Sequence, residues 1–196
     1  MAEYTANIVS TDASLTALVI GEDTYTGTAY SSIVSAVSGG SVTAVAEGLY
    51  SAQGTIQMNG DTLVGDEGAI IANNTAITNF AVALEVKGSG NVISGMTFYK
   101  NVQSPATTGN FGGPALWNGA SSLTVNSSVF DGNVATNLGG AIRYTASSTA
   151  TFALNDSVLT GNTSRGGGAL YLNLAEMTIS GTEFSSNKST ANAGAI

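Results

Sequence analysis

The chain has 196 residues, of which 9% are charged and 43% hydrophobic, and five Lys and Arg against thirteen Asp and Glu give a net charge of −8 at pH 7. It contains no His and no Cys, which excludes Ser-His-Asp and Cys-His catalysis, His-ligated zinc and disulfides within this chain. The few cations also argue against nucleic-acid binding, which requires a basic surface.

The first 40 residues are expected to form an N-terminal cap made of a strand and a short helix. Ile33, Val34 and Val37 share one face of the helix predicted over Tyr30–Ser38, and two glycines follow it. The exposed edge of a first coil invites aggregation, so a stack of coils needs such a cover. We therefore divide the chain into a cap, residues 1–40, and a repeat domain, residues 41–196.

Short apolar segments separated by turn residues indicate strands in the first part of the repeat domain. The expected strands are Val42–Tyr50, running into a Gly turn, and Thr55–Met58, Thr62–Gly65, Ala69–Ala72, Ile77–Phe80 and Ala83–Val86.

A repeat of about 27 residues is visible in the second half, since an aromatic residue or Leu is followed three positions later by Asn in four segments. The first column is Phe98, Phe130, Leu159 and Phe184, and the second is Asn101, Asn133, Asn162 and Asn187. A Gly- and Ala-containing segment follows each copy: GGPAL, with Pro114 inserted, then GGAI, GGAL and AGAI.

The repeat length and the alternation of apolar and polar residues predict two or three short strands per repeat, stacked as a β-solenoid. Stacking makes both columns structural ladders. The aromatic column would point inward, and the Asn column would occupy left-handed turns and pass hydrogen bonds along a ladder of amides.

The paired FxxN and GGAI/GGAL motifs resemble the repeats of the chlamydial polymorphic outer-membrane proteins, which are autotransporter adhesins. The segment Gly39–Gly65 is similar to the first coils of pectin-lyase-like β-helices. The resemblance implies an all-β fold, a right-handed parallel β-helix of about six coils with a small N-terminal cap. The chain stops at Ile196 inside the fourth copy of the Gly-Ala motif, so we expect the repeat array to be truncated at its C-terminus, leaving an open coil.

Pectin-lyase-like folds include polysaccharide lyases and glycosidases, so paired carboxylates were sought. Asp131 and Asp156 fall in different columns, and Asp61, Asp66 and Glu67 have no cation near them in sequence. We therefore expect no enzymatic activity, no catalytic residues, no metal site and no cofactor.

One row of large side chains is a candidate binding site. The residues that follow Leu116, Ile142 and Leu170 are Trp117, Arg143 and Tyr171. Stacking in register would place them on the outer surface of consecutive coils, as a patch for a sugar or a partner protein. The alternative is a stabilising cross-strand ladder.

The function expected from these features is a non-enzymatic cell-surface adhesin or autotransporter passenger domain, a rigid, repeat-built rod involved in cell adhesion and virulence. Its partner would be a host-surface protein or glycan, and the open C-terminal coil would allow end-to-end self-association. Two alternatives remain open: a carbohydrate-active β-helix enzyme, such as a polysaccharide lyase, hydrolase or tailspike-like depolymerase, and a self-stacking structural surface element.

The expected localisation is the bacterial cell surface, as an outer-membrane or secreted protein. No run of 18 apolar residues occurs, so this chain should not span a membrane. The N-terminal sequence MAEYTANIVS lacks the basic and apolar regions of a signal peptide. We therefore expect the signal and the anchor to lie outside this chain.

Overall fold

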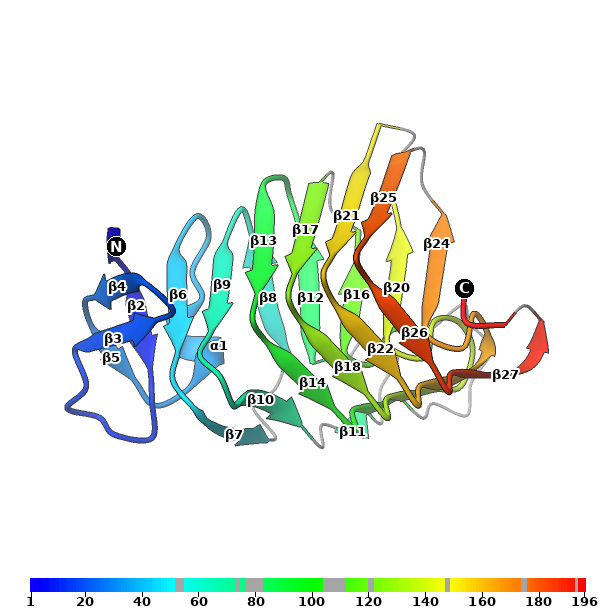
Figure 1. Cartoon of the computed structure of the whole chain (residues 1–196), viewed down its shortest axis with the longest axis horizontal. Helices are drawn as coiled ribbons and strands as arrows, with labels where there is room; N and C mark the ends of the chain where they lie inside the picture. The colour runs from blue at the N-terminus through cyan, green and yellow to red at the C-terminus, as the bar shows by residue number, and fades with distance from the viewer. Residues whose placement is uncertain are drawn as a thin grey trace.

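Parallel pairing between strands about one repeat apart organises the chain (Figure 1). The structure is a computed structural model that describes residues 1–51, 55–72, 75–76, 83–103, 112–119, 122–146, 149–173, 176–192 and 194–196. For residues 51, 75–76 and 117–118 the structure describes the backbone but not the side chains. The expected strand Ile77–Phe80 and the Ala193 of the last motif lie outside the described residues.

Four parallel sheets, named B to E, form the walls of the solenoid, and a three-stranded sheet A lies before them. Sheet A contains β1 (Glu3–Thr5), β3 (Ala17–Ile20) and β4 (Asp23–Thr26). Sheet B contains β2 (Asn7–Val9), β5 (Ala29–Tyr30), β6 (Val42–Val45), β9 (Thr62–Gly65), β13 (Asn91–Ser94), β17 (Ser122–Asn126), β21 (Thr151–Asn155) and β25 (Glu176–Ser180). Sheet C contains β7 (Gly48–Ser51), β10 (Ala69–Ala72), β14 (Thr97–Tyr99), β18 (Val129–Asp131), β22 (Val158–Thr160) and β26 (Glu183–Ser185).

The other two sheets complete each turn. Sheet E contains β11 (Thr75–Ala76), β15 (Val102–Gln103), β19 (Val134–Ala135), β23 (Thr163–Gly166) and β27 (Lys188–Asn192). Sheet D contains β8 (Ile56–Asn59), β12 (Leu84–Lys87), β16 (Leu116–Asn118), β20 (Ile142–Thr145) and β24 (Leu170–Asn173).

Each complete turn passes through sheets B, C, E and D in that order. Four turns are complete, β9–β12, β13–β16, β17–β20 and β21–β24, while β6–β8 and β25–β27 belong to partial turns at the two ends. The all-β parallel β-solenoid is thus confirmed. The expectation of about six coils was slightly high, because it counted the partial turns as whole ones.

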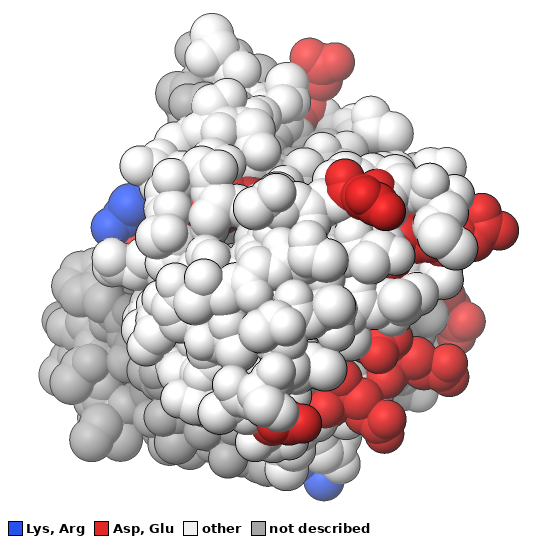
Figure 2. All heavy atoms as spheres, turned by 90° about the vertical axis from the view of Figure 1, so that its left-hand side faces the viewer, with Lys and Arg blue, Asp and Glu red and all other residues white. Residues whose placement is uncertain are grey.

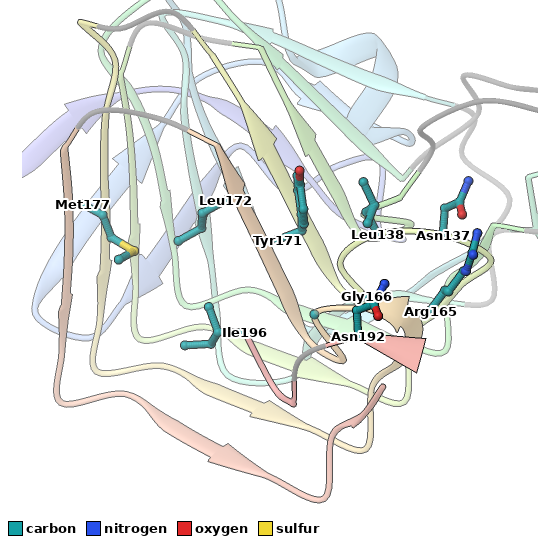
Figure 3. A pocket seen from close by; sticks show the side chains of 10 residues that line it. Asn137, Leu138, Arg165, Gly166, Tyr171, Leu172, Met177, Asn192 and Ile196 are labelled. Atoms are coloured by element: carbon teal, nitrogen blue, oxygen red, sulfur yellow. The ribbon is translucent and has the colours of Figure 1, made fainter. Parts of the chain in front are cut away.

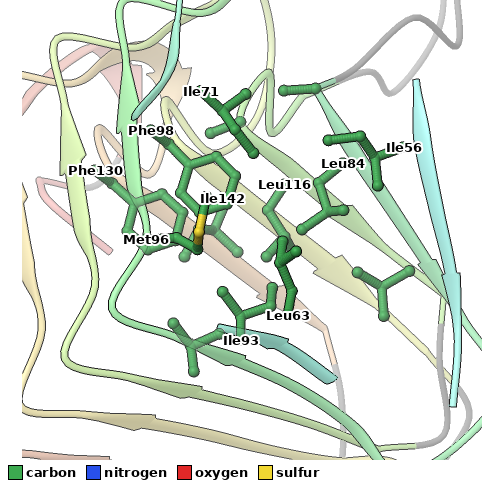
Figure 4. Close-up of a cluster of buried hydrophobic side chains, with 14 of the residues drawn as sticks. Ile56, Leu63, Ile71, Leu84, Ile93, Met96, Phe98, Leu116, Phe130 and Ile142 are labelled. Carbon is green, nitrogen blue, oxygen red and sulfur yellow. The ribbon is translucent and has the colours of Figure 1, made fainter. Parts of the chain in front are cut away.

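Alternating burial along the strands creates the core, since successive side chains of a strand point to opposite faces. In β18 the central Phe130 is fully buried and its two neighbours are half-buried. The rings of Phe98 and Phe130 stack with centroids 4.8 Å apart and an interplanar angle of 6° (Figure 4). Ile71 precedes them and Leu159 and Phe184 follow in the same register, so one apolar column runs through five turns.

The residues before the solenoid contain more strand than expected. The helix α1 covers Ile33–Ala36, shorter than the expected Tyr30–Ser38, because Val37 already has an extended backbone. β3 and β4 form an antiparallel hairpin around Gly21, and β2 and β5 lie beyond β6 in sheet B. Strands from residues 1–40 therefore cover the first edge of sheet B, while the domain boundary at residue 40 stays a prediction.

Glycine turns separate sheets E and D in the repeats. Gly113, Gly139 and Gly167 have φ values of 65°, 65° and 63°, and a Cβ on Gly139 would lie 2.0 Å from the backbone oxygen of Ile142. Ala115 donates to Ala141 across the turns, at 3.2 Å. Pro114 therefore replaces the second glycine of the motif. The expectation that it is an insertion was wrong, because the motif keeps its length.

Candidate functional site

The four Asn residues of the repeat form a hydrogen-bonded ladder. The Oδ1 atom of Asn162 accepts from the backbone N–H of Asn133 at 2.9 Å and from its Nδ2 at 3.0 Å. The same two bonds join Asn101 to Asn133 and Asn162 to Asn187, at 2.9–3.0 Å. Each Nδ2 also donates to a backbone carbonyl one turn back, such as Phe130 O for Asn162, at 2.8 Å.

The left-handed turns expected for these Asn residues lie one position earlier. Lys100, Gly132, Gly161 and Ser186 have φ values of 49°, 63°, 62° and 56°, and each directly precedes an Asn of the ladder. The Asn side chain is used for hydrogen bonding, and the preceding residue supplies the positive φ. Because Asn101, Asn133 and Asn162 are fully buried, their amides hold adjacent turns together and are not available to a ligand.

Two of the carboxylates considered for catalysis, Asp61 and Asp156, lie in connections between strands. Asp61 is fully buried and accepts from Ser41 N, Ser41 Oγ and Asn59 N at 2.7–2.9 Å, which gives it a structural role in a turn. Asp156 has a φ of 48° and occupies a turn next to Gly181. No group of three or more acidic residues suited to a metal ion occurs among the described residues.

The outer face of sheet D differs from that of sheet B in its residue types. β9, β13, β17 and β21 of sheet B contain no charged residue. Sheet D carries Glu85, Lys87 and Arg143 together with the aromatic residues Trp117 and Tyr171. Sheet D therefore offers more varied chemistry than these four strands of sheet B.

One register position of sheet D contains the predicted binding residues. Trp117 pairs with Arg143, and Arg143 pairs with Tyr171, on adjacent strands. Glu85 pairs with Trp117, and Gln57 pairs with Glu85, so the position continues into the first turns. We call these five residues the sheet D row; the side chain of Trp117 lies outside the described set.

In the first half of the sheet D row, formed by Gln57 and Glu85, the carboxylate of Glu85 is paired with neighbouring side chains. Gln57 Nε2 donates to Glu85 Oε2 at 2.8 Å, and Lys87 Nζ lies 3.0 Å from Glu85 Oε1. Both carboxylate oxygens of Glu85 thus have partners. This part of the row fits the cross-strand ladder described above as the alternative.

The second half of the row, from Trp117 to Tyr171, contains a polar atom without a hydrogen-bond partner among the described residues. Arg143 is half-buried, and its Nε is a buried atom that has no hydrogen-bond partner among the described residues. Burial lowers the pKa of the Arg143 guanidinium, while Tyr171 acts in the opposite direction. On the same face of β20, the buried Oγ1 of Thr145 also lacks a partner in the described part of the chain. The inward residue between them, Tyr144, is fully buried and donates to Thr151 O at 3.1 Å.

A pocket of about 630 Å³ borders Tyr171 near the C-terminal strands (Figure 3). Leu172, Met177 and Ile196 give it apolar walls, and Arg165 contributes a cation. Tyr171 is the residue that this pocket shares with the sheet D row.

At the other end of the molecule, acidic side chains gather along one side of the N-terminal face (Figure 2).

Two residues of the row, Gln57 and Glu85, were missed in the sequence, as were two residues beside it, Thr145 and Asn173. Ala83-Leu84 repeats the Ala-Leu of GGPAL without its glycines, and Leu84 N donates to Ala115 O at 3.1 Å. That pair would have placed Glu85 in the row. Thr145 and Asn173, which pair with each other, lie two positions after Arg143 and Tyr171 on the same strands.

Comparison with known families supports the resemblance predicted from the motifs. Residues 127–144 match the Chlamydia polymorphic membrane protein (Chlamydia_PMP) repeat. This segment includes Phe130, Asn133, the Gly139 turn and Arg143. The match confirms the resemblance for residues 127–144, and the parallel β-solenoid is consistent with repeats of this type along the chain. Searches of curated proteins and of solved structures find no match to the chain.

The sequence predicts that this chain does not span a membrane, and the structure bears on this prediction for helices. Within the described residues, no helix combines the length and apolar character needed to cross a bilayer.

Proposed function

We propose that this chain is a passenger-type β-helix displayed on a bacterial surface, where it attaches to a host-cell protein or glycan through the sheet D row. The proposal includes an outer-membrane or secreted autotransporter as the parent protein and no enzymatic activity of this segment. The polymorphic membrane protein repeat, matched over residues 127–144, supports the surface role.

The observation that carries the proposal is the juxtaposition of Arg143 and Tyr171 on adjacent turns. Their strands pair in register, both side chains are half-buried, and the buried Nε of Arg143 has no hydrogen-bond partner among the described residues. Arg, Tyr and Trp are the residue types enriched in binding hot spots, because they offer contact area and donors at low entropic cost. Trp117 occupies the same register position on the adjacent strand β16.

Attachment of beads coated with the purified chain to cultured epithelial cells tests the proposal. The double variant Trp117→Ala, Arg143→Ala should require at least about a tenfold higher coating density for half-maximal attachment, the effect of losing a hot spot. The control is Val92→Ala, Thr124→Ala, which removes half-buried outer side chains from sheet B. Equal attachment by both folded variants and the parent chain would reduce the row to a structural ladder.

A further inference from the structure

Buried polar atoms without partners gather on one strand. Three buried side-chain atoms of the described residues have no hydrogen bond: Gln103 Oε1, Arg143 Nε and Thr145 Oγ1. Gln103 is in sheet E, whereas Arg143 and Thr145 lie two residues apart in β20. Two residues along a strand span about 6.6 Å, and both side chains are on the outer face.

An unsatisfied buried donor destabilises a folded protein, so a pair of such groups on one surface needs a physical reason. The guanidinium of Arg143 presents a planar set of donors suited to a carboxylate. The Thr145 hydroxyl can donate and accept. Both residues are half-buried, which leaves part of each side chain within reach of a ligand that brings a carboxylate and hydroxyl groups.

The neighbouring strand completes a grid of four side chains. Arg143 pairs with Tyr171, and Thr145 pairs with Asn173, in the same register. Adjacent strands lie about 4.8 Å apart, so the grid measures about 4.8 by 6.6 Å, comparable with one sugar ring. Its corners are a cation, an aromatic ring, a hydroxyl and a carboxamide.

We infer that a pyranose that carries a carboxylate binds to Arg143, Thr145, Tyr171 and Asn173. This inference rests on the proposed function and names the class of its ligand. Arg143 donates to the carboxylate, and Thr145 and Asn173 exchange hydrogen bonds with ring hydroxyls. The Tyr171 ring lies against the C–H face of the sugar. The grid thus includes both residues of β20 that carry a buried side-chain atom without a partner in the described part of the chain.

The surroundings favour a singly charged sugar over other anions. The chain has a net charge of −8 and five cations in all, so a polyanion such as a sulfated glycan would be repelled. An extended peptide cannot add to β20 as a strand, because β16 and β24 already pair with it on both sides.

The test is a titration of the whole chain, followed by NMR, with two matched pairs of sugars. Methyl glucuronide is compared with methyl glucoside, and the methyl glycoside of N-acetylneuraminic acid with its methyl ester. We expect the acids to bind and the neutral partners to bind at least about tenfold more weakly, the loss of one charge-assisted hydrogen bond. The two pairs distinguish a uronic acid from a sialic acid as the source of the carboxylate.

Variants localise the binding. Arg143→Gln should weaken binding of the acid by at least about tenfold, whereas Lys188→Gln, which removes an exposed cation from sheet E, should leave it unchanged. Thr145→Val should weaken binding and raise the melting temperature, because a buried hydroxyl without a partner is replaced by a methyl group. That opposite movement of affinity and stability separates a binding residue from a structural one.

The outcomes separate the ligand class from the proposed function. Cell attachment that depends on Arg143 but is not inhibited by either free acid, with no binding by NMR, overturns the carboxylated sugar and indicates a protein partner. Acid binding that is unaffected by Arg143→Gln overturns the site. Attachment unaffected by the row variants contradicts the proposed function, even where the sugar binds.

Discussion

The side-chain oxygen of Asn133 accepts two hydrogen bonds from Asn101, one from its backbone N–H at 2.9 Å and one from its Nδ2 at 3.0 Å. The Nδ2 of Asn133 in turn donates to Asn162 Oδ1 and to Phe98 O, each at 3.0 Å. One buried side chain therefore connects three successive turns. The ladder makes the stability of each turn depend on its neighbours, as in other repeat proteins.

Replacement of Asn133 by Ala should lower the free energy of unfolding by at least about 2 kcal/mol, because two buried N–H groups of Asn101 lose their acceptor. Asn126→Ala is the matched control: Asn126 Oδ1 accepts one bond from Asn155 Nδ2 at 3.0 Å, on the partly exposed face of sheet B. Water can replace that bond, so a loss below about 1 kcal/mol is expected. Urea titration measures the free energy of unfolding of both variants. Equal losses would show that the buried Asn ladder stabilises the fold no more than the partly exposed hydrogen bond of Asn126.

The aromatic column should tolerate a change of shape better than a loss of volume. Phe130→Ala removes a ring that stacks on Phe98 and should cost about 3–5 kcal/mol. Phe130→Leu should cost no more than about 2 kcal/mol, because Leu159 fills the same register position in the next turn. Thermal unfolding of the two variants checks the order, and the reverse order would contradict a packed column.

The glycine turn should be more sensitive to a methyl group than glycines elsewhere. Gly139→Ala places a Cβ against the Ile142 backbone oxygen in a left-handed conformation and should cost at least about 2 kcal/mol. Gly119→Ala is the control, since a Cβ there has no heavy atom within 4 Å. Similar melting temperatures for the two variants would argue against the turn geometry.

Residue types that repeat in register could be predicted from the sequence, because residues at equivalent positions of successive repeats stack on one another in the solenoid. The Phe98 and Asn101 columns and the register of Trp117, Arg143 and Tyr171 follow from counting alone. The β3–β4 hairpin could not be found this way, since it occurs once and its strands pair with each other rather than with a repeat.

The chemistry of the site required coordinates. Counting places Arg143 beside Tyr171, but only the structure shows that Arg143 Nε and Thr145 Oγ1 are both buried and have no partner among the residues that it describes. The sequence also assigned the positive φ to the Asn residues, whereas Lys100 and Ser186 adopt it. Burial and hydrogen bonding depend on neighbouring turns, which a linear pattern does not contain.

Alkaline pH should destabilise the fold through its buried tyrosines. Burial raises the pKa of Tyr50, whose hydroxyl donates to Ala46 O at 3.0 Å, and burial followed by the charge of Asp23 raises that of Tyr25. The unfolded chain then loses these protons first, so stability is complete below about pH 10 and falls as the pH rises toward the folded pKa. Melting temperatures from pH 8 to 11 should fall less steeply for Tyr50→Phe, and identical slopes would refute the assignment.

The two halves of the sheet D row should contribute unequally to attachment. Glu85 already holds Gln57 and Lys87 at 2.8 Å and 3.0 Å, so its carboxylate has little left to offer a partner. Glu85→Gln should therefore change half-maximal attachment by less than about twofold, and stability by less than about 1 kcal/mol, as for other exposed ion pairs. Arg143→Gln, in the same row, should reduce attachment at least about tenfold, because it removes a half-buried guanidinium whose Nε has no partner among the described residues. The same cell-attachment assay measures both variants, and a larger effect at Glu85 would move the binding surface to the N-terminal turns of sheet D.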